Sequence, residues 1–277
     1  MKFKIVGDSC TDFLPEDRAK EYTVTVPLTI EVGDDEVIDD DSFNQSDLLR
    51  KIADYEGCPK SACPSPETYM KSFEDAEEVY VVTLSSGLSG SYNSAELAKA
   101  TYLESHPDVK IHVFDSKSAS SGQLLIARLI EKYALSGMAF EEIVEKVTAF
   151  RDELHTTFVL DDLETLRKNG RLSGVKAVVA NALNIKPYLK VEDGTIQQIG
   201  QARGMRKALD KMVDYIGEVG TNLSDKVVII SHCNCMDRAK DVERKLLGKY
   251  GFKDSIIIDT KGISTMYAND GGVIVSF

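Results

Sequence analysis

The chain has 277 residues, of which 43% are hydrophobic and 28% charged, as expected for a globular protein with one large or two modest domains. Its formal net charge of -12 disfavours nucleic acid and anionic membrane surfaces as partners. The sequence shows no apolar run typical of a signal peptide or a membrane-spanning helix, and its odd number of cysteines fits a reducing compartment. We therefore expect a cytoplasmic protein without stable membrane insertion.

The first half of the chain alternates apolar, β-rich runs with amphipathic segments, which predicts a parallel sheet covered by helices. The extended stretch near 22–40, with its Gly-Asp-Asp turn, is typical of an inserted β-hairpin. Ser46 and Ser65 each precede a predicted helix as its N-cap residue. The stretch EGCPKSACPSPETY, residues 56–69, is expected to be a polar loop, with Ser65 marking the helix start. The strands are predicted at FKIVG, EVYVVT and VKIHVF, and the helices at PEDRAKEY, 46–55, NSAELAKATYLE and GQLLIARLIEKYA.

After about residue 155 the pattern changes. Asp193-Gly194 lies between two strand-like runs and is a strong hairpin signal. A hairpin among helices and strands indicates a mixed sheet and a second α/β domain. We therefore expect an N-terminal domain at 1–155 and a C-terminal domain at 156–277. The second domain's elements are predicted at TTFV, LETLRK, KPYLKVE, TIQQIGQAR, MRKALDKMVDYIGEV, KVVIIS, MDRAKDVERKLLGKY, SIIIDT and GGVIVSF.

Three loops rich in small hydroxyl residues follow predicted strands of the first domain: GDSCTD, LSSGLSGSY and FDSKSASSGQ. Because parallel strands end at the same edge of a sheet, these loops are expected to meet there and form a binding crevice. Glycines allow close approach of a ligand to the backbone, and the N-terminus of a helix favours an anion such as a carboxylate or phosphate. A plain turn with a well-capped helix is the alternative explanation of LSSGLSGSY.

Recognisable catalytic and metal-binding patterns are missing from the sequence. It has no Walker A motif, no G-x-S-x-G elbow and no G-x-G-x-x-G, and Cys233 and Cys235 lack the spacing of a zinc site. A hydrolase or transferase with Ser61 or Ser89 as nucleophile remains an alternative, although no histidine lies beside either serine to activate it. A pure interaction module is a third hypothesis. We expect a binding protein without metal or cofactor.

The loops DSCTD, PKSACPSP, LSSGLSGSYNSA, FDSKSASSGQ and LETLRKNGRLSG occur in an order that resembles the DegV family of bacterial fatty-acid-binding proteins, nearly end to end. The resemblance implies two α/β domains with a fatty acid held between them. It also implies a separate ATP-dependent kinase subunit, which converts the bound acid to an acyl phosphate for phospholipid metabolism. The chain itself would then be a lipid-binding protein rather than an enzyme.

The resemblance also implies which residues bind the ligand. Ser61 stands where the family usually has threonine, and Ser89 with the Gly90 amide corresponds to the carboxylate-binding turn. Tyr267 stands where many members have histidine. A phenol can donate to a carboxylate, but unlike an imidazole it does not titrate near neutral pH.

The same resemblance places Arg167 and Arg171 near the head group, where they are expected to face the kinase or another acidic partner. Basic residues that complement a helix dipole are the alternative. The apolar faces of 122–130 and 174–185 are candidate walls for the acyl chain, with ordinary core packing as the alternative.

Overall fold

The structure is a computed structural model that describes residues 2–172 and 184–277. Its first sheet, sheet A, is wholly parallel, with the strand order β2-β1-β6-β7. This confirms the parallel sheet predicted for the first half of the chain. The strands of sheet A are β1 (Phe3–Asp8), β2 (Thr23–Val26), β6 (Glu78–Thr83) and β7 (Lys110–Asp115).

The second sheet, sheet C, is mixed, with the order β10-β9-β8-β13-β11-β12. Only β11 and β12 pair in parallel, and β9 and β10 form the predicted hairpin around Asp193-Gly194. The predicted α/β class with one parallel and one mixed sheet is therefore confirmed. The strands of sheet C are β8 (Thr156–Val159), β9 (Ile185–Glu192), β10 (Thr195–Arg203), β11 (Val227–His232), β12 (Asp254–Asp259) and β13 (Val273–Ser276).

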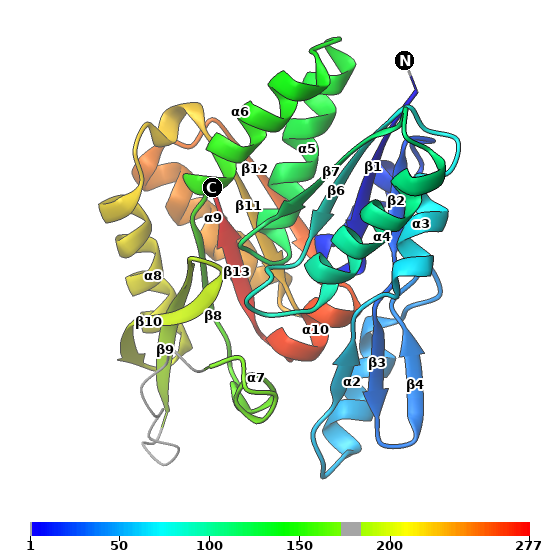
Figure 1. Cartoon of the computed structure of the whole chain (residues 1–277). Helices are drawn as coiled ribbons and strands as arrows, with labels where there is room; N and C mark the ends of the chain where they lie inside the picture. The colour runs from blue at the N-terminus through cyan, green and yellow to red at the C-terminus, as the bar shows by residue number, and fades with distance from the viewer. Residues whose placement is uncertain (1, 173–183) are drawn as a thin grey trace.

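Helices cover both sheets and one of them lies between the sheets (Figure 1). The helices are α1 (Pro15–Arg18), α2 (Gln45–Asp54), α3 (Pro66–Phe73), α4 (Ser91–Ser105), α5 (Ser121–Leu135), α6 (Phe140–Asp152), α7 (Glu164–Lys168), α8 (Met205–Val219), α9 (Met236–Tyr250) and α10 (Gly262–Ala268), with 3-10 turns at Ser9–Thr11 and Leu223–Asp225. Helices α3 and α4 pack on one face of sheet A, and α8 and α9 on the outer face of sheet C. Helix α5 packs against both sheets, since its apolar residues share one cluster with Tyr80 of sheet A and Ile229 of sheet C.

A small third sheet, sheet B, has the order β4-β3-β5. Its strands are β3 (Thr29–Val32), β4 (Asp35–Ile38) and β5 (Lys60–Ala62). It shares an apolar cluster with α2 and α10, in which Ile30, Leu48 and Met266 are fully or almost fully buried. Sheet B therefore attaches α10, a C-terminal element, to the N-terminal half of the chain.

Some details differ from the sequence predictions. The inserted hairpin is β3–β4 with its turn at Gly33, and it starts later than residue 22 because Thr23–Val26 joins sheet A beside β1. Helix α2 is capped by Asn44, whose side chain accepts a hydrogen bond from the Asp47 amide, and not by Ser46. Strand β5 and helices α6 and α10 were not predicted. Sheet C begins at Thr156, but the exact domain boundary at 155/156 stays a prediction.

Candidate functional site

The three hydroxyl-rich loops meet at the carboxyl edge of sheet A, as predicted. Asp8 joins them: its Oδ2 accepts hydrogen bonds from the Leu84 amide at 2.7 Å and the Ser91 hydroxyl at 2.6 Å, and its Oδ1 accepts one from Gln123 at 2.8 Å. The Asp8 side chain is fully buried, and this burial raises the pKa of its carboxyl. The loops are thus fixed to one another before any ligand binds.

A second buried carboxylate, Asp12, uses another of the predicted hydroxyls. Its Oδ2 accepts a 2.5 Å hydrogen bond from Ser120, and its Oδ1 accepts one from the Lys261 amide at 2.8 Å. Burial raises the pKa of Asp12 to about 7. Several serines of these loops are therefore structural, and fewer hydroxyls face a ligand than the sequence suggested.

Helix α10 is held at its N-terminus by carboxylates from the other end of the chain. Besides the bond from Lys261 to Asp12, the amides of Gly262 and Ile263 donate to Asp39 at 2.7 and 2.9 Å. A β-carbon on Gly262 would lie 2.6 Å from the Asp39 carboxyl, so a larger residue there would displace this carboxylate. These contacts fix the helix that carries Tyr267.

A polar pocket beside Tyr267 of α10 contains every ligand-binding residue predicted from the sequence. The Ser61 and Tyr267 hydroxyls lie 3.2 Å apart, within hydrogen-bonding distance, on β5 and α10. The Ser89 hydroxyl accepts a 3.2 Å bond from the Ser91 amide, which leaves its proton available for an acceptor. The pocket is lined by Leu28, Ser61, Ala62, Cys63, Leu84, Leu88, Ser89, Gly90, Arg171 and Tyr267. The structure therefore brings Ser61 and Tyr267 together although they are 206 positions apart in the sequence.

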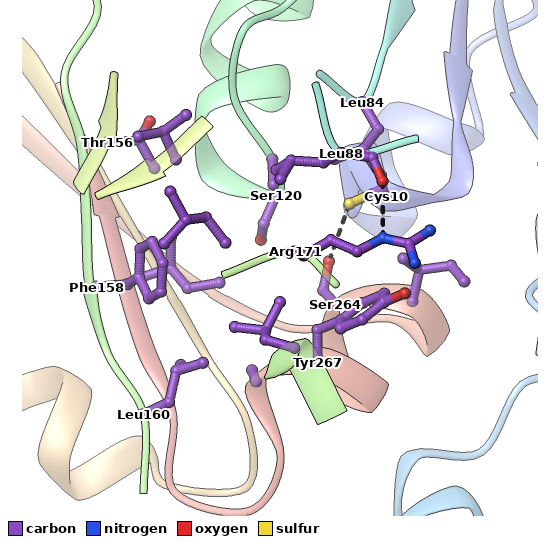
Figure 2. Close-up of a pocket in the computed structure, with 17 residues that line it drawn as sticks. Cys10, Leu84, Leu88, Ser120, Thr156, Phe158, Leu160, Arg171, Ser264 and Tyr267 are labelled. Atoms are coloured by element: carbon purple, nitrogen blue, oxygen red, sulfur yellow. Dashed lines mark hydrogen bonds between the residues drawn. The ribbon is translucent and has the colours of Figure 1, made fainter. Parts of the chain in front are cut away.

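An apolar cavity lies beside the polar pocket, and Figure 2 shows the side chains that line this cavity. Both spaces share the lining residues Leu84, Leu88, Arg171 and Tyr267, so they lie next to each other. The lining of the apolar cavity comes from both halves of the chain: Cys10, Leu84, Leu88, Ala119, Ser120, Thr156, Phe158, Leu160, Leu166, Arg171, Val191, Ile196, Ile263, Ser264, Tyr267, Ala268 and Ile274. Among the polar side chains of this lining, Ser120 and Thr156 are hydrogen-bonded to Asp12 and Ser276, which do not line the cavity.

The first candidate acyl-chain wall predicted from sequence, 122–130, does not match this lining. None of residues 122–130 lines the cavity, because Leu124, Ile126 and Ile130 of α5 are buried in the core between the sheets. Of the second candidate segment, residues 174–183 lie outside the described residues.

Arg171 and Arg167, both expected to face a partner, differ in their surroundings. Arg171 lies in the wall of both spaces, where its Nε donates to the Leu88 carbonyl at 3.1 Å (Figure 2). Arg167 is exposed on α7 and forms two hydrogen bonds, of 2.8 and 2.6 Å, with Glu164. Arg171 is thus a pocket residue, and whether either arginine contacts a partner stays a prediction.

A sequence model of the family described as "Uncharacterised protein, DegV family" matches residues 2–277. The chain belongs to the DegV family. Among curated proteins, a DegV domain-containing protein of Streptococcus pneumoniae is 35% identical over 280 residues, which cover all of this chain and 99% of that protein.

Two solved DegV structures are similar over nearly their whole length. The DegV protein of Ruminococcus gnavus, described with vaccenic acid, is 51% identical with a TM-score of 0.96, over 99% of both chains. The fatty acid kinase B3 protein of Streptococcus pneumoniae, loaded with linoleic acid, is 34% identical with a TM-score of 0.91, over 100% of this chain and 99% of that one.

The histidines of this DegV chain lie outside both spaces. None of His106, His112, His155 and His232 lines the pocket or the cavity, and burial lowers the pKa of His112 to about 4. Ser61 and Ser89 therefore have no imidazole base within the site, which argues against the serine-dependent hydrolase. In residues 2–172 and 184–277, no helix has the length and apolarity needed to cross a bilayer.

Proposed function

We propose that this DegV protein binds a long-chain fatty acid, with the carboxylate in the polar pocket and the acyl chain in the apolar cavity. The observation that carries the proposal is the adjacency of a polar and an apolar space, which share four lining residues. A ligand that fills both must be polar at one end and apolar along the rest. The fatty acids named for the R. gnavus and S. pneumoniae relatives have this shape.

The carboxylate is proposed to accept hydrogen bonds from Ser61, Ser89, Tyr267 and the Gly90 amide. Gly90 is the N-cap of α4, a fifteen-residue helix, so the helix dipole also favours a negative charge there. Arg171 adds a positive charge to the wall of the same pocket. Each hydrogen bond to the charged group contributes about 1.5–3 kcal/mol.

The acyl chain is proposed to supply most of the affinity. Burial of roughly a dozen methylenes at about 0.8 kcal/mol each amounts to about 10 kcal/mol before the costs of association. The wall contributed by Phe158, Leu160 and Ile274 is apolar, as such a chain requires. Tail burial therefore sets how tightly the ligand binds, and the hydroxyls set its direction.

We further propose that the protein presents the acid to a separate ATP-dependent kinase in the cytoplasm, for acyl-phosphate formation and phospholipid metabolism. The similarity to the pneumococcal fatty acid kinase B3 protein supports this proposal. Arg167, exposed on α7, is proposed to face the kinase, because the loop that follows α7 carries Arg171 into the head-group pocket.

The binding proposal is tested with vaccenic acid and vaccenyl alcohol, which share one chain and differ in the carboxylate. Delipidated protein is expected to bind the acid at least about tenfold more tightly than the alcohol. A variant with both Ser61→Ala and Tyr267→Phe should lose most of that preference. Equal affinities of the wild-type protein for acid and alcohol would contradict the head-group assignment, and binding of neither would contradict the function.

A further inference from the structure

The tip of the β9–β10 hairpin lies across one side of the acyl cavity. Val191 and Ile196 are paired across the two strands, so their side chains lie on the same face of the hairpin, and both line the cavity. Val191 also pairs with Thr156, the first residue of β8. Residues 192–195 therefore extend past the end of β8, and the tip needs a support other than its own sheet.

That support is the loop that carries the head-group residues. The Ser85 hydroxyl, which is fully buried, donates a 2.7 Å hydrogen bond to the Gly194 carbonyl at the hairpin tip. It also accepts a bond from the Gly87 amide at 3.2 Å, which leaves its proton directed at Gly194. One side chain of the first sheet's loop thus fixes the hairpin of the second sheet.

Two glycines make this contact possible. A β-carbon on Gly87 would lie 2.6 Å from the Gly194 carbonyl oxygen and 3.2 Å from Thr195. A β-carbon on Gly194, whose φ is +75°, would lie 2.6 Å from the Ser85 hydroxyl. Any larger residue at position 87 must push the hairpin tip away, because the obstructing atom belongs to the backbone.

Ser85 also fixes the turn that presents the proposed carboxylate ligand Ser89. Its carbonyl accepts hydrogen bonds from the Leu88 and Ser89 amides at 2.9 and 3.0 Å. The Ser85 hydroxyl therefore fixes the hairpin that walls the acyl cavity, and the Ser85 carbonyl fixes the turn that carries Ser89.

We propose that Ser85, with Gly87 and Gly194 fitted around it, is a positioning residue that latches the β9–β10 hairpin over the acyl cavity and slows release of the bound fatty acid. The inference rests on the proposed function for its ligand. The latch itself depends only on contacts within the protein, so it can be tested separately from binding.

The first test measures amide hydrogen exchange of residues 192–196 without ligand in three variants. Ser85→Ala removes one buried hydrogen bond, so exchange should be about fivefold faster, and Gly87→Ala, which displaces the tip, should have a larger effect. Gly248→Ala is the matched control, because a β-carbon at this position of α9 meets no atom within 4 Å. Unchanged exchange at the tip in both Ser85→Ala and Gly87→Ala would overturn the latch.

The second test measures release of vaccenic acid by stopped-flow transfer to an acceptor protein. Release should be about fivefold faster from Ser85→Ala and at least about tenfold faster from Gly87→Ala, with Gly248→Ala equal to wild type. Faster exchange at the tip with unchanged release would overturn the role in retention. A wild-type protein that binds no vaccenic acid would instead overturn the proposed function, and the retention role with it.

Discussion

Removal of one hydroxyl, in Tyr267→Phe, tests the proposed carboxylate site without changing the shape of the cavity wall. The Tyr267 hydroxyl lies 3.2 Å from Ser61, its hydrogen-bond partner among the residues that the structure describes. A hydrogen bond to a charged group contributes about 1.5–3 kcal/mol. Because Ser61 and Tyr267 are only half-buried, water weakens the bond, and the lower value applies. Tyr267→Phe should therefore bind vaccenic acid about tenfold more weakly than wild type.

The assay is titration of delipidated protein between pH 6 and pH 8, with Tyr133→Phe as the control. Tyr133, on α5, lines neither space, so its variant should bind like wild type. A third variant, Tyr267→His, introduces an imidazole, which ordinarily titrates near pH 6.5, and should gain affinity as the pH falls from 8 to 6. Wild-type affinity in Tyr267→Phe would refute the hydrogen bond and leave the tyrosine ring with a packing role only.

Three further variants test other parts of the account. Ser89→Ala should weaken vaccenic acid binding about tenfold with little change in thermal midpoint, and a midpoint that falls with unchanged affinity would make Ser89 structural. Leu88→Ala should lower the affinity about tenfold, because this half-buried residue lines both spaces, and an unchanged affinity would place the chain elsewhere. The pKa of Asp12 is raised to about 7 in the folded state, so folded Asp12 holds its proton more tightly than Asp12 of the unfolded chain. This group therefore makes the free energy of unfolding fall as the pH rises from about 4 to about 7. Asp12→Asn should flatten that fall by up to about 1.4 kcal/mol per pH unit, as urea unfolding at several pH values will show, and an identical slope in the variant would contradict the raised pKa.

The sequence allowed prediction of the strands that end in hydroxyl-rich loops, because apolar runs followed by Asp-Ser or Ser-Gly have a clear pattern. Asp8 and Ser91 lie in those loops, and their convergence follows from a parallel sheet. Ser89 and Gly90 of the polar pocket lie in one of these loops, whereas Ser61 and Tyr267 were predicted only through resemblance to a family. Ser61 and Tyr267 are 206 positions apart, and neither has a local pattern that points to the other.

Helix α10 shows why other features were not predictable. It has seven residues, and almost all of them are buried, so it has no amphipathic pattern. Its N-terminus is held by Asp39, which is 223 positions from Gly262 in the sequence. The place of Arg171 in the pocket wall likewise depends on a tertiary contact, its hydrogen bond to the Leu88 carbonyl. Such contacts are set by tertiary structure and leave no local signal.

The most direct test of the account is native mass spectrometry of the protein purified from bacteria, before and after addition of vaccenic acid. If one long-chain fatty acid binds in the adjacent pocket and cavity, the mass of the protein should exceed its unliganded mass by that of one fatty acid, either on purification or after the addition. The fraction of protein that carries this added mass should be smaller in Ser89→Ala and in Tyr267→Phe. A protein that stays entirely at its unliganded mass, with excess vaccenic acid present, would contradict the account.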